Sequence, residues 1–240
     1  MYKITYQLRT YLQMQQMGWE EWQECLAIAK DIVLKIRKVY TCICKGKTAD
    51  LEADVEFQAW LTKTADELER DGKNKKALEL RDPKNTADAL KKYVAYLKTT
   101  LPGVCFQASD FAVSIGEKAY NKNKSGHWRE QRYAFLSGLV VIDVDHLPHA
   151  RELFERLKNQ FDFVKEGILL IYISARGEGL KIIFKARPEW SNLICQQYEM
   201  ASKLGILDYV DDSCKDSSRL SFLTGEDDVL YVDSKELFNQ

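Results

Sequence analysis

The chain has 240 residues, of which 45% are hydrophobic and 30% charged, so it has ample apolar material for a buried core and does not resemble a disordered chain. The 35 Lys and Arg residues balance 36 Asp and Glu residues, which means that a polyanionic partner must be met by a local basic surface. No apolar run approaches the ~20 residues that span a bilayer, and residues 1–5 lack the apolar segment of a secretory signal. We therefore expect a cytoplasmic protein with no membrane partner.

The six cysteines do not form a zinc-binding pattern. Only Cys42 and Cys44 are close together, and they have neither a second cysteine pair nor a nearby histidine beside them. We expect reduced thiols, most of them buried.

The first hundred residues have the periodicity of helices. Apolar residues recur at steps of three and four in Trp22 to Tyr40, in Val55 to Leu68 and in Ala87 to Leu97. The segment from Lys73 to Lys84 is rich in charge, and we expect it to be a connector. We therefore expect residues 1–84 to form a helical N-terminal region.

Short apolar runs separated by helical segments follow Gly103, and we expect them to form a second domain over residues 85–240. The sequence predicts strands at 104–106, 136–144, 168–174, 180–184, 209–210 and 220–223, and helices at 150–161 and 189–204. This alternation predicts an α+β fold with a mixed or antiparallel sheet.

The run from Val140 to His146 places two carboxylates on one strand. Asp143 and Asp145 are two positions apart and therefore face the same side, while Ile142 and Val144 face the core. Paired carboxylates repel unless a cation neutralises them, and such oxygen donors suit Mg²⁺ or Mn²⁺. The alternative is a strand end with two solvated aspartates.

The segment from Ser174 to Lys181 joins two apolar strands through a turn that contains Gly177 and Gly179. Glycines allow a ligand to approach the backbone closely, while Ser174, Arg176 and Lys181 offer a hydroxyl group and two cations to phosphate oxygens. The alternative is an ordinary hairpin with glycine in its turn.

A third polar segment, from Asp211 to Phe222, carries candidates for another metal ligand and one more cation. Asp211 is the first choice for that ligand, Asp212 and Asp216 remain open, and Arg219 precedes a short strand. The alternative is a solvated, charged loop.

Taken in this order, the three motifs resemble those of the archaeo-eukaryotic primase (primase-polymerase) superfamily, which read hydrophobic-D-x-D/E, S/G-x-H, and an acid followed by a base. The VirE N-terminal-like primase domains of bacterial mobile elements are the most similar lineage. Tyr96 to Phe106 resembles their lysine-rich helix and K-x-x-L-P entry, and Leu136 to Leu147 resembles their S-G-L-hhh-D-h-D-h-L strand. The resemblance spans Asn85 to Val232.

The resemblance implies a primase-polymerase catalytic core with an RRM-like element, which makes primers or DNA from nucleoside triphosphates on a single-stranded or primed DNA template. It implies two Mg²⁺ or Mn²⁺ ions and a helicase or an accessory primase domain as a partner. The implied metal ligands and catalytic residues are Asp143, Asp145 and Asp211, and the implied triphosphate-binding residues are Ser174, Arg176, Gly177, Gly179, Lys181 and Arg219. Lys181 stands where the family has histidine, and it supplies a point charge that does not titrate near neutrality.

A segment with alternating cations and aromatic rings lies between residues 118 and 132 and is a candidate track for the template. Its nucleic-acid-binding candidates are Lys122, Lys124, Trp128, Arg129 and Arg132. The alternative is a solvated loop whose aromatic rings enter the core. Two other functions remain open for the whole chain: a degenerate primase fold that binds nucleotides or single strands without forming bonds, and a metal-dependent nuclease.

Overall fold

The computed structural model describes residues 2–9, 12–113, 126–127, 129–147, 149–211 and 215–239. The chain divides into two compact units, which we call the mixed unit (residues 1–31 and 101–240) and the helical unit (residues 32–100). The boundary falls inside helix α1 (Trp19–Cys44). None of the helices in the described residues combines the length and the apolar content needed to cross a membrane.

The observed division differs from the one expected at residue 84. Strand β1 (Thr5–Gln7) pairs with β3 (Gly103–Cys105), so the first residues of the chain belong to the mixed unit and are not helical there. Paired residues of the two strands are 96 to 100 positions apart in the sequence, and local periodicity does not predict such a pairing.

The helical unit contains three helices besides the second part of α1: α2 (Val55–Arg70), α3 (Asn74–Arg81) and α4 (Thr86–Thr99). The expectation that the segment from Lys73 to Lys84 is a connector was wrong, because most of this segment forms α3. This short helix buries Ala77 and Leu80 on one face, and Arg81 in its last turn forms ion pairs with α2. Tertiary packing therefore stabilises a helix that was difficult to predict from its highly charged sequence.

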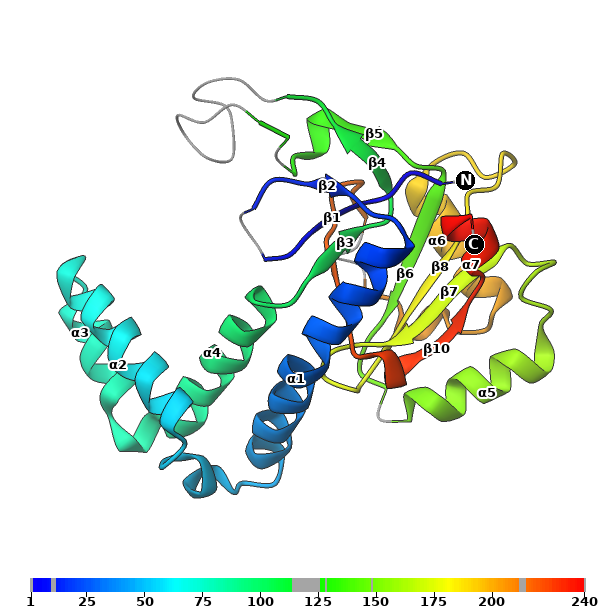
Figure 1. Ribbon diagram of the computed structural model, residues 1–240. Coiled ribbons are helices and arrows are strands. Elements are labelled where there is room, and N and C mark those ends of the chain that lie inside the picture. Colours follow the sequence, from blue (N-terminus) through cyan, green and yellow to red (C-terminus); the bar gives the residue numbers. More distant parts are fainter. Residues whose placement is uncertain are drawn as a thin grey trace. The chain divides into compact units, whose positions relative to one another are not determined.

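The described residues of the mixed unit form three groups of strands and, besides the first part of α1, three α-helices (Figure 1). The first sheet has the order β2-β1-β3-β9, with β2 at Gln15–Gln16 and β9 at Ser221–Phe222, and the ribbon pairs β4 (Ala108–Phe111) with β5 (Ala134–Leu136). The second sheet has the order β10-β7-β8-β6, formed by β6 (Leu139–Val144), β7 (Ile168–Ile173), β8 (Leu180–Lys185) and β10 (Val229–Val232). The helices are α5 (Ala150–Gln160), α6 (Leu193–Lys203) and α7 (Ser234–Phe238).

The second sheet follows a split βαβ arrangement. The chain runs β6-α5-β7-β8-α6 and then returns to β6, where Val210 forms an antiparallel bridge with Val144. Strand β8 lies between β6 and β7, so two βαβ units interlock in one sheet. Every strand pairing among the described residues is antiparallel, which confirms an α+β fold with antiparallel sheets.

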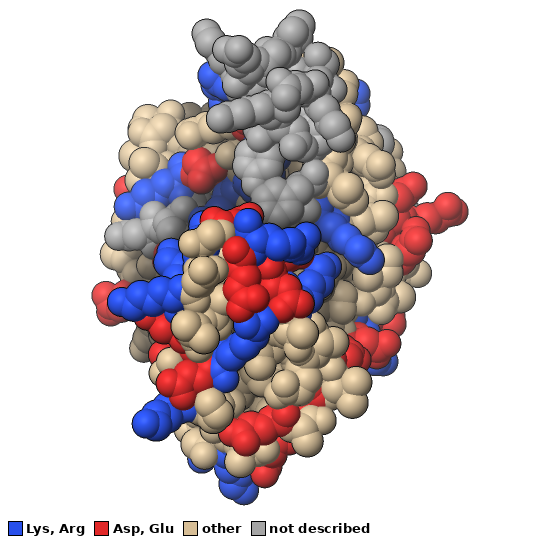
Figure 2. Space-filling view, turned by 90° about the vertical axis from the view of Figure 1, so that its left-hand side faces the viewer, with Lys and Arg blue, Asp and Glu red and all other residues tan. Residues whose placement is uncertain are grey.

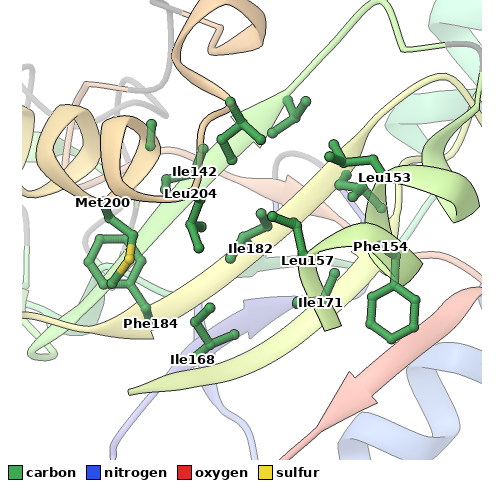
Figure 3. Close-up of a cluster of buried hydrophobic side chains, with 14 of the residues drawn as sticks. Ile142, Leu153, Phe154, Leu157, Ile168, Ile171, Ile182, Phe184, Met200 and Leu204 are labelled. Carbon is green, nitrogen blue, oxygen red and sulfur yellow. The ribbon is translucent and has the colours of Figure 1, made fainter. Parts of the chain in front are cut away.

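One face of this sheet forms the core beneath α5 and α6 (Figure 3). Ile142, Ile182 and Phe184 of the strands pack with Leu157 of α5 and Met200 of α6, and all five are fully buried. Burial of each such side chain contributes about 1.5–3 kcal/mol. Because side chains alternate along a strand, the neighbours of Ile142 project from the opposite face of the sheet.

Candidate functional site

Three carboxylates converge at the end of β6. Asp143 is in that strand, Asp145 follows it, and Asp211 follows the residue that bridges to it. One oxygen from each of the three side chains lies within 4.8 Å of the others. The sequence predicted this convergence, although 66 residues separate Asp145 from Asp211.

Backbone pairing brings the distant acid to the other two. The amide of Asp211 donates to the carbonyl of Asp143 at 2.8 Å, and the amide of Asp145 donates to the carbonyl of Tyr209 at 3.1 Å. The segment that ends in Asp211 thus extends the sheet beyond β6, and the register places its carboxylate beside the other two. Three carboxylates supply the hard oxygen donors that Mg²⁺ and Mn²⁺ prefer, so the donor set fits such ions.

Each carboxylate of the cluster has a cation as its neighbour. Lys181 forms an ion pair with Asp143, which lies opposite it in the β6–β8 register. Arg176 Nη2 lies 3.9 Å from an oxygen of Asp145. The remaining pair joins Arg219 Nη2 to an oxygen of Asp211 at 3.7 Å. These cations offset the repulsion between carboxylates that would otherwise oppose folding.

The three ion pairs differ in burial. The side chains of Asp143 and Lys181 are only 5% and 14% exposed, whereas those of Arg176 and Arg219 are 27% and 39% exposed. The buried pair is held inside the protein, where losing one partner leaves an uncompensated charge. Both arginines are accessible to water. Separating either one from its carboxylate therefore costs less free energy than separating Lys181 from Asp143.

The turn between β7 and β8 lies directly against the end of the acidic strand. Gly177 adopts φ 86°, which glycine reaches without strain, and its amide donates to the carbonyl of Ser174 at 2.8 Å. A Cβ atom on Gly179 would lie 2.1 Å from the carbonyl oxygen of Val144. Glycine at this position thus allows the turn to approach the carboxylates.

The structure describes two of the three candidate acids that follow α6, Asp211 and Asp216, the latter in the loop that carries Arg219. Asp216 accepts hydrogen bonds from the amide and the hydroxyl of Ser218 at 2.9 and 2.7 Å, so its carboxylate stabilises the loop. Among the described residues the acidic cluster contains Asp211 and not Asp216. Asp212 lies outside the described residues.

Gln107, which the sequence analysis did not single out, connects this loop to the acidic strand. Its side chain donates to the carbonyl of Asp216 at 2.5 Å and accepts from the amide of Val141 at 3.1 Å. Gln197 of α6 donates to the carbonyl of Val141 at 2.9 Å. In the sequence, the signal for this role is a polar residue between two short apolar segments. In the structure, Gln107 is only 1% exposed, and a buried amide of this kind requires hydrogen-bond partners.

The structure describes part of the candidate template track. Arg129 donates to the carbonyl of Ser218 at 2.6 Å and thereby holds the Arg219 loop. Arg132 forms an ion pair with Glu130 at 2.7 Å, and its guanidinium lies 4.9 Å from the ring centroid of Tyr133. Lys122, Lys124 and Trp128 lie outside the described residues. Nucleic-acid binding by this track stays a prediction.

The buried cysteines are not suited to ligate metal. Burial raises the pKa of Cys25 and of Cys105 to about 12, which keeps both thiols protonated at neutral pH. The described cysteines are free thiols, and Cys44 is exposed.

Part of the chain matches a family of known proteins. Residues 121–231 match the family described as BT4734-like, N-terminal domain, which covers less than half of the chain. The matched range includes the three carboxylates of the cluster and the three cations paired with them. No curated protein and no solved structure matches the chain.

Proposed function

We propose that the mixed unit is a nucleotidyltransferase of the primase-polymerase type, which extends a primer on a DNA template with nucleoside triphosphates. The convergence of Asp143, Asp145 and Asp211 within 4.8 Å carries this proposal. The split βαβ sheet supports it, because the acidic strand is its first strand and Asp143 projects from the face opposite α5 and α6.

The three carboxylates would hold two Mg²⁺ or Mn²⁺ ions. Such ions, when bound, activate the attacking 3′-hydroxyl and stabilise the leaving pyrophosphate. The chain itself supplies cations for the triphosphate: Arg176 and Arg219 are partly exposed and lie beside the acidic cluster, so each is close to where a metal-bound phosphate would lie. The glycine-containing turn holds Ser174 and Arg176 beside the cluster.

One observation favours a second function, a primase fold that binds nucleotides without forming bonds. The ammonium of Lys181 is paired with Asp143 in a buried environment, so it competes with a metal ion for that carboxylate. Two arginines would still bind phosphate in such a protein.

Primer extension tests the proposal. The full chain is incubated with a primed DNA template and with ribo- or deoxyribonucleoside triphosphates, in Mg²⁺ and in Mn²⁺. We expect incorporation that is lost in Asp143→Asn, Asp145→Asn and Asp211→Asn. Asp162→Asn is the matched control, because Asp162 is exposed and lies outside the acidic cluster.

The alternatives give different results in the same assay. Nucleotide binding that survives Asp143→Asn, with no incorporation by the unaltered protein, would establish the binding module instead. Loss of labelled DNA without triphosphate would establish a nuclease.

A further inference from the structure

Four aromatic rings form a contiguous cluster in the helical unit, between α2 and α4, in which the Phe57–Trp60 and Tyr93–Tyr96 contacts are stacked and the others are tilted. Trp60 lies 6.0 Å from Phe57, 5.2 Å from Tyr93 and 6.1 Å from Tyr96, measured between ring centroids. The rings of Tyr93 and Tyr96 are almost parallel, with an interplanar angle of 16°. We call Trp60 and Tyr96, the members that reach the surface, the aromatic platform.

The cluster has a buried end and a solvent-exposed end. Phe57 and Tyr93 are each 2% exposed and belong to the core of the unit. Tyr96 is 45% exposed, and Trp60 is partly exposed. The buried rings fix the orientation of the exposed ones, so the platform loses little conformational entropy when a flat ligand stacks on it.

Cations flank the platform. Lys63 follows Trp60 by three positions and Lys92 precedes Tyr96 by four, so each shares a helix face with its ring, and both lysines are exposed. Glu56, one turn before Trp60, forms an ion pair with Lys35. The helical unit carries 15 Lys and Arg residues against 11 Asp and Glu residues, although the whole chain is slightly acidic.

One face of the molecule (Figure 2) carries no broad basic track among its described residues. On the face shown in Figure 2, Lys and Arg side chains are interspersed with Asp and Glu, and the described residues there show no continuous patch of one sign. A duplex is held mainly by phosphate contacts and has its bases already stacked on one another. An unpaired strand offers exposed base faces, which stack on aromatic side chains whatever the sequence.

We propose that the aromatic platform binds single-stranded nucleic acid, with bases stacked on Tyr96 and Trp60 and with backbone phosphates near Lys63 and Lys92. The platform lies entirely within the helical unit. The proposal therefore does not require the acidic cluster to be catalytic, and it goes beyond the function proposed for that cluster.

Fluorescence anisotropy with two labelled oligonucleotides tests the role of the bases. One is oligo-dT, and the other is an abasic strand of the same length, which has the same phosphates but no bases. We expect the full chain to bind oligo-dT more tightly. We expect Tyr96→Ala to weaken oligo-dT binding by about tenfold and to leave abasic binding unchanged, because stacking carries that share of the affinity. Tyr96→Phe, which keeps the ring, should bind oligo-dT like the unaltered protein.

Three further variants complete the design. Leu78→Ala removes a more exposed apolar side chain from α3, 68% exposed against 45% for Tyr96, and should leave binding unchanged. The double variant Lys63→Gln/Lys92→Gln should reduce the salt dependence of oligo-dT binding. Asp162→Asn, which alters an exposed carboxylate of the mixed unit outside the acidic cluster, should bind oligo-dT normally. Circular dichroism checks the fold of each variant.

The proposal is overturned if the unaltered chain binds both strands equally, or if Tyr96→Ala binds oligo-dT as Leu78→Ala does. Sedimentation velocity on the unaltered protein and on Tyr96→Ala provides another decisive result. A change in self-association without a change in oligo-dT binding would assign the platform to a second copy of the chain and overturn the proposal.

Discussion

At the scale of single residues, the acidic cluster has a balanced set of charges. Lys181, Arg176 and Arg219 each neutralise one carboxylate, and the pair between Lys181 and Asp143 is the most buried of the three. A buried ion pair adds little net stability, but removing one partner is costly. Lys181 therefore stabilises the fold while it competes with metal for Asp143.

Replacing Lys181 with alanine should separate these two effects. We expect Lys181→Ala to lower the free energy of unfolding by about 3 kcal/mol, because the carboxylate of Asp143 is left buried without its cation. Added Mn²⁺ should raise the melting temperature of this variant more than that of the unaltered protein, since a bound ion stabilises the folded state by mass action. Urea titration and thermal melts measure both.

The control for this prediction is the double variant Lys181→Ala/Asp143→Asn. It should recover part of the lost stability, because a neutral amide is less costly to bury than an unpaired carboxylate. A double variant as unstable as the sum of the two single variants would show that the pair does not couple.

At the scale of secondary-structure elements, the turn between β7 and β8 depends on close backbone contact with β6. Gly179 approaches the carbonyl of Val144 so closely that a Cβ atom would lie 2.1 Å from it. The atom in the way belongs to the backbone of β6, which cannot move aside without disturbing its pairing with β8 and its bridge to Val210. The position of the cationic turn is therefore coupled to the end of the acidic strand.

Gly179→Ala should displace the turn and destabilise the fold by about 1–3 kcal/mol, the usual cost of forcing extra atoms into a packed site. Gly18→Ala is the matched control, since a Cβ atom there meets only the carboxylate of Glu21, a flexible side chain. We expect the control to cost much less. Equal losses of stability in the two variants, measured by urea titration, would contradict the close contact at Gly179.

At the scale of the whole molecule, the chain separates into two units with distinct chemistry. The mixed unit holds the acidic cluster, and the helical unit holds the aromatic platform. Each unit has its own buried residues: Leu90 of α4, for example, is fully buried within the helical unit. Separate cores allow one unit to open without the other.

Leu90→Ala should test whether the two units open independently. A buried leucine truncated to alanine costs about 2–5 kcal/mol. We expect amide hydrogen exchange to become faster in α2 and α4, while the protection of β6, β7 and β8 stays unchanged. If exchange becomes faster in both units to the same extent, the chain unfolds as one cooperative body.

Several features were predictable because their signals are local. The alternation of apolar residues in β6 placed Asp143 on one face and Ile142 on the other, and helical periodicity placed α1, α2 and α4. The glycine-containing turn between two apolar runs predicted the hairpin of β7 and β8. In each case neighbouring residues carry the information.

Other features depend on pairings between distant segments, which a single sequence does not display. Three acids followed α6 as candidate ligands, and only the register at Val144 and Val210 determined that Asp211 joins the cluster while Asp216 stabilises its own loop. The role of Gln107 has the same origin, because its partners are far away in the chain.

The sequence by itself determined the chemistry that this protein can offer: paired carboxylates, cations beside glycines, and aromatic side chains at helical spacing. The tertiary structure decided which of these groups meet. Side-chain chemistry and periodicity belong to residues that are close in the chain, whereas proximity in space depends on strand register and on packing between segments that fold together only in the complete chain.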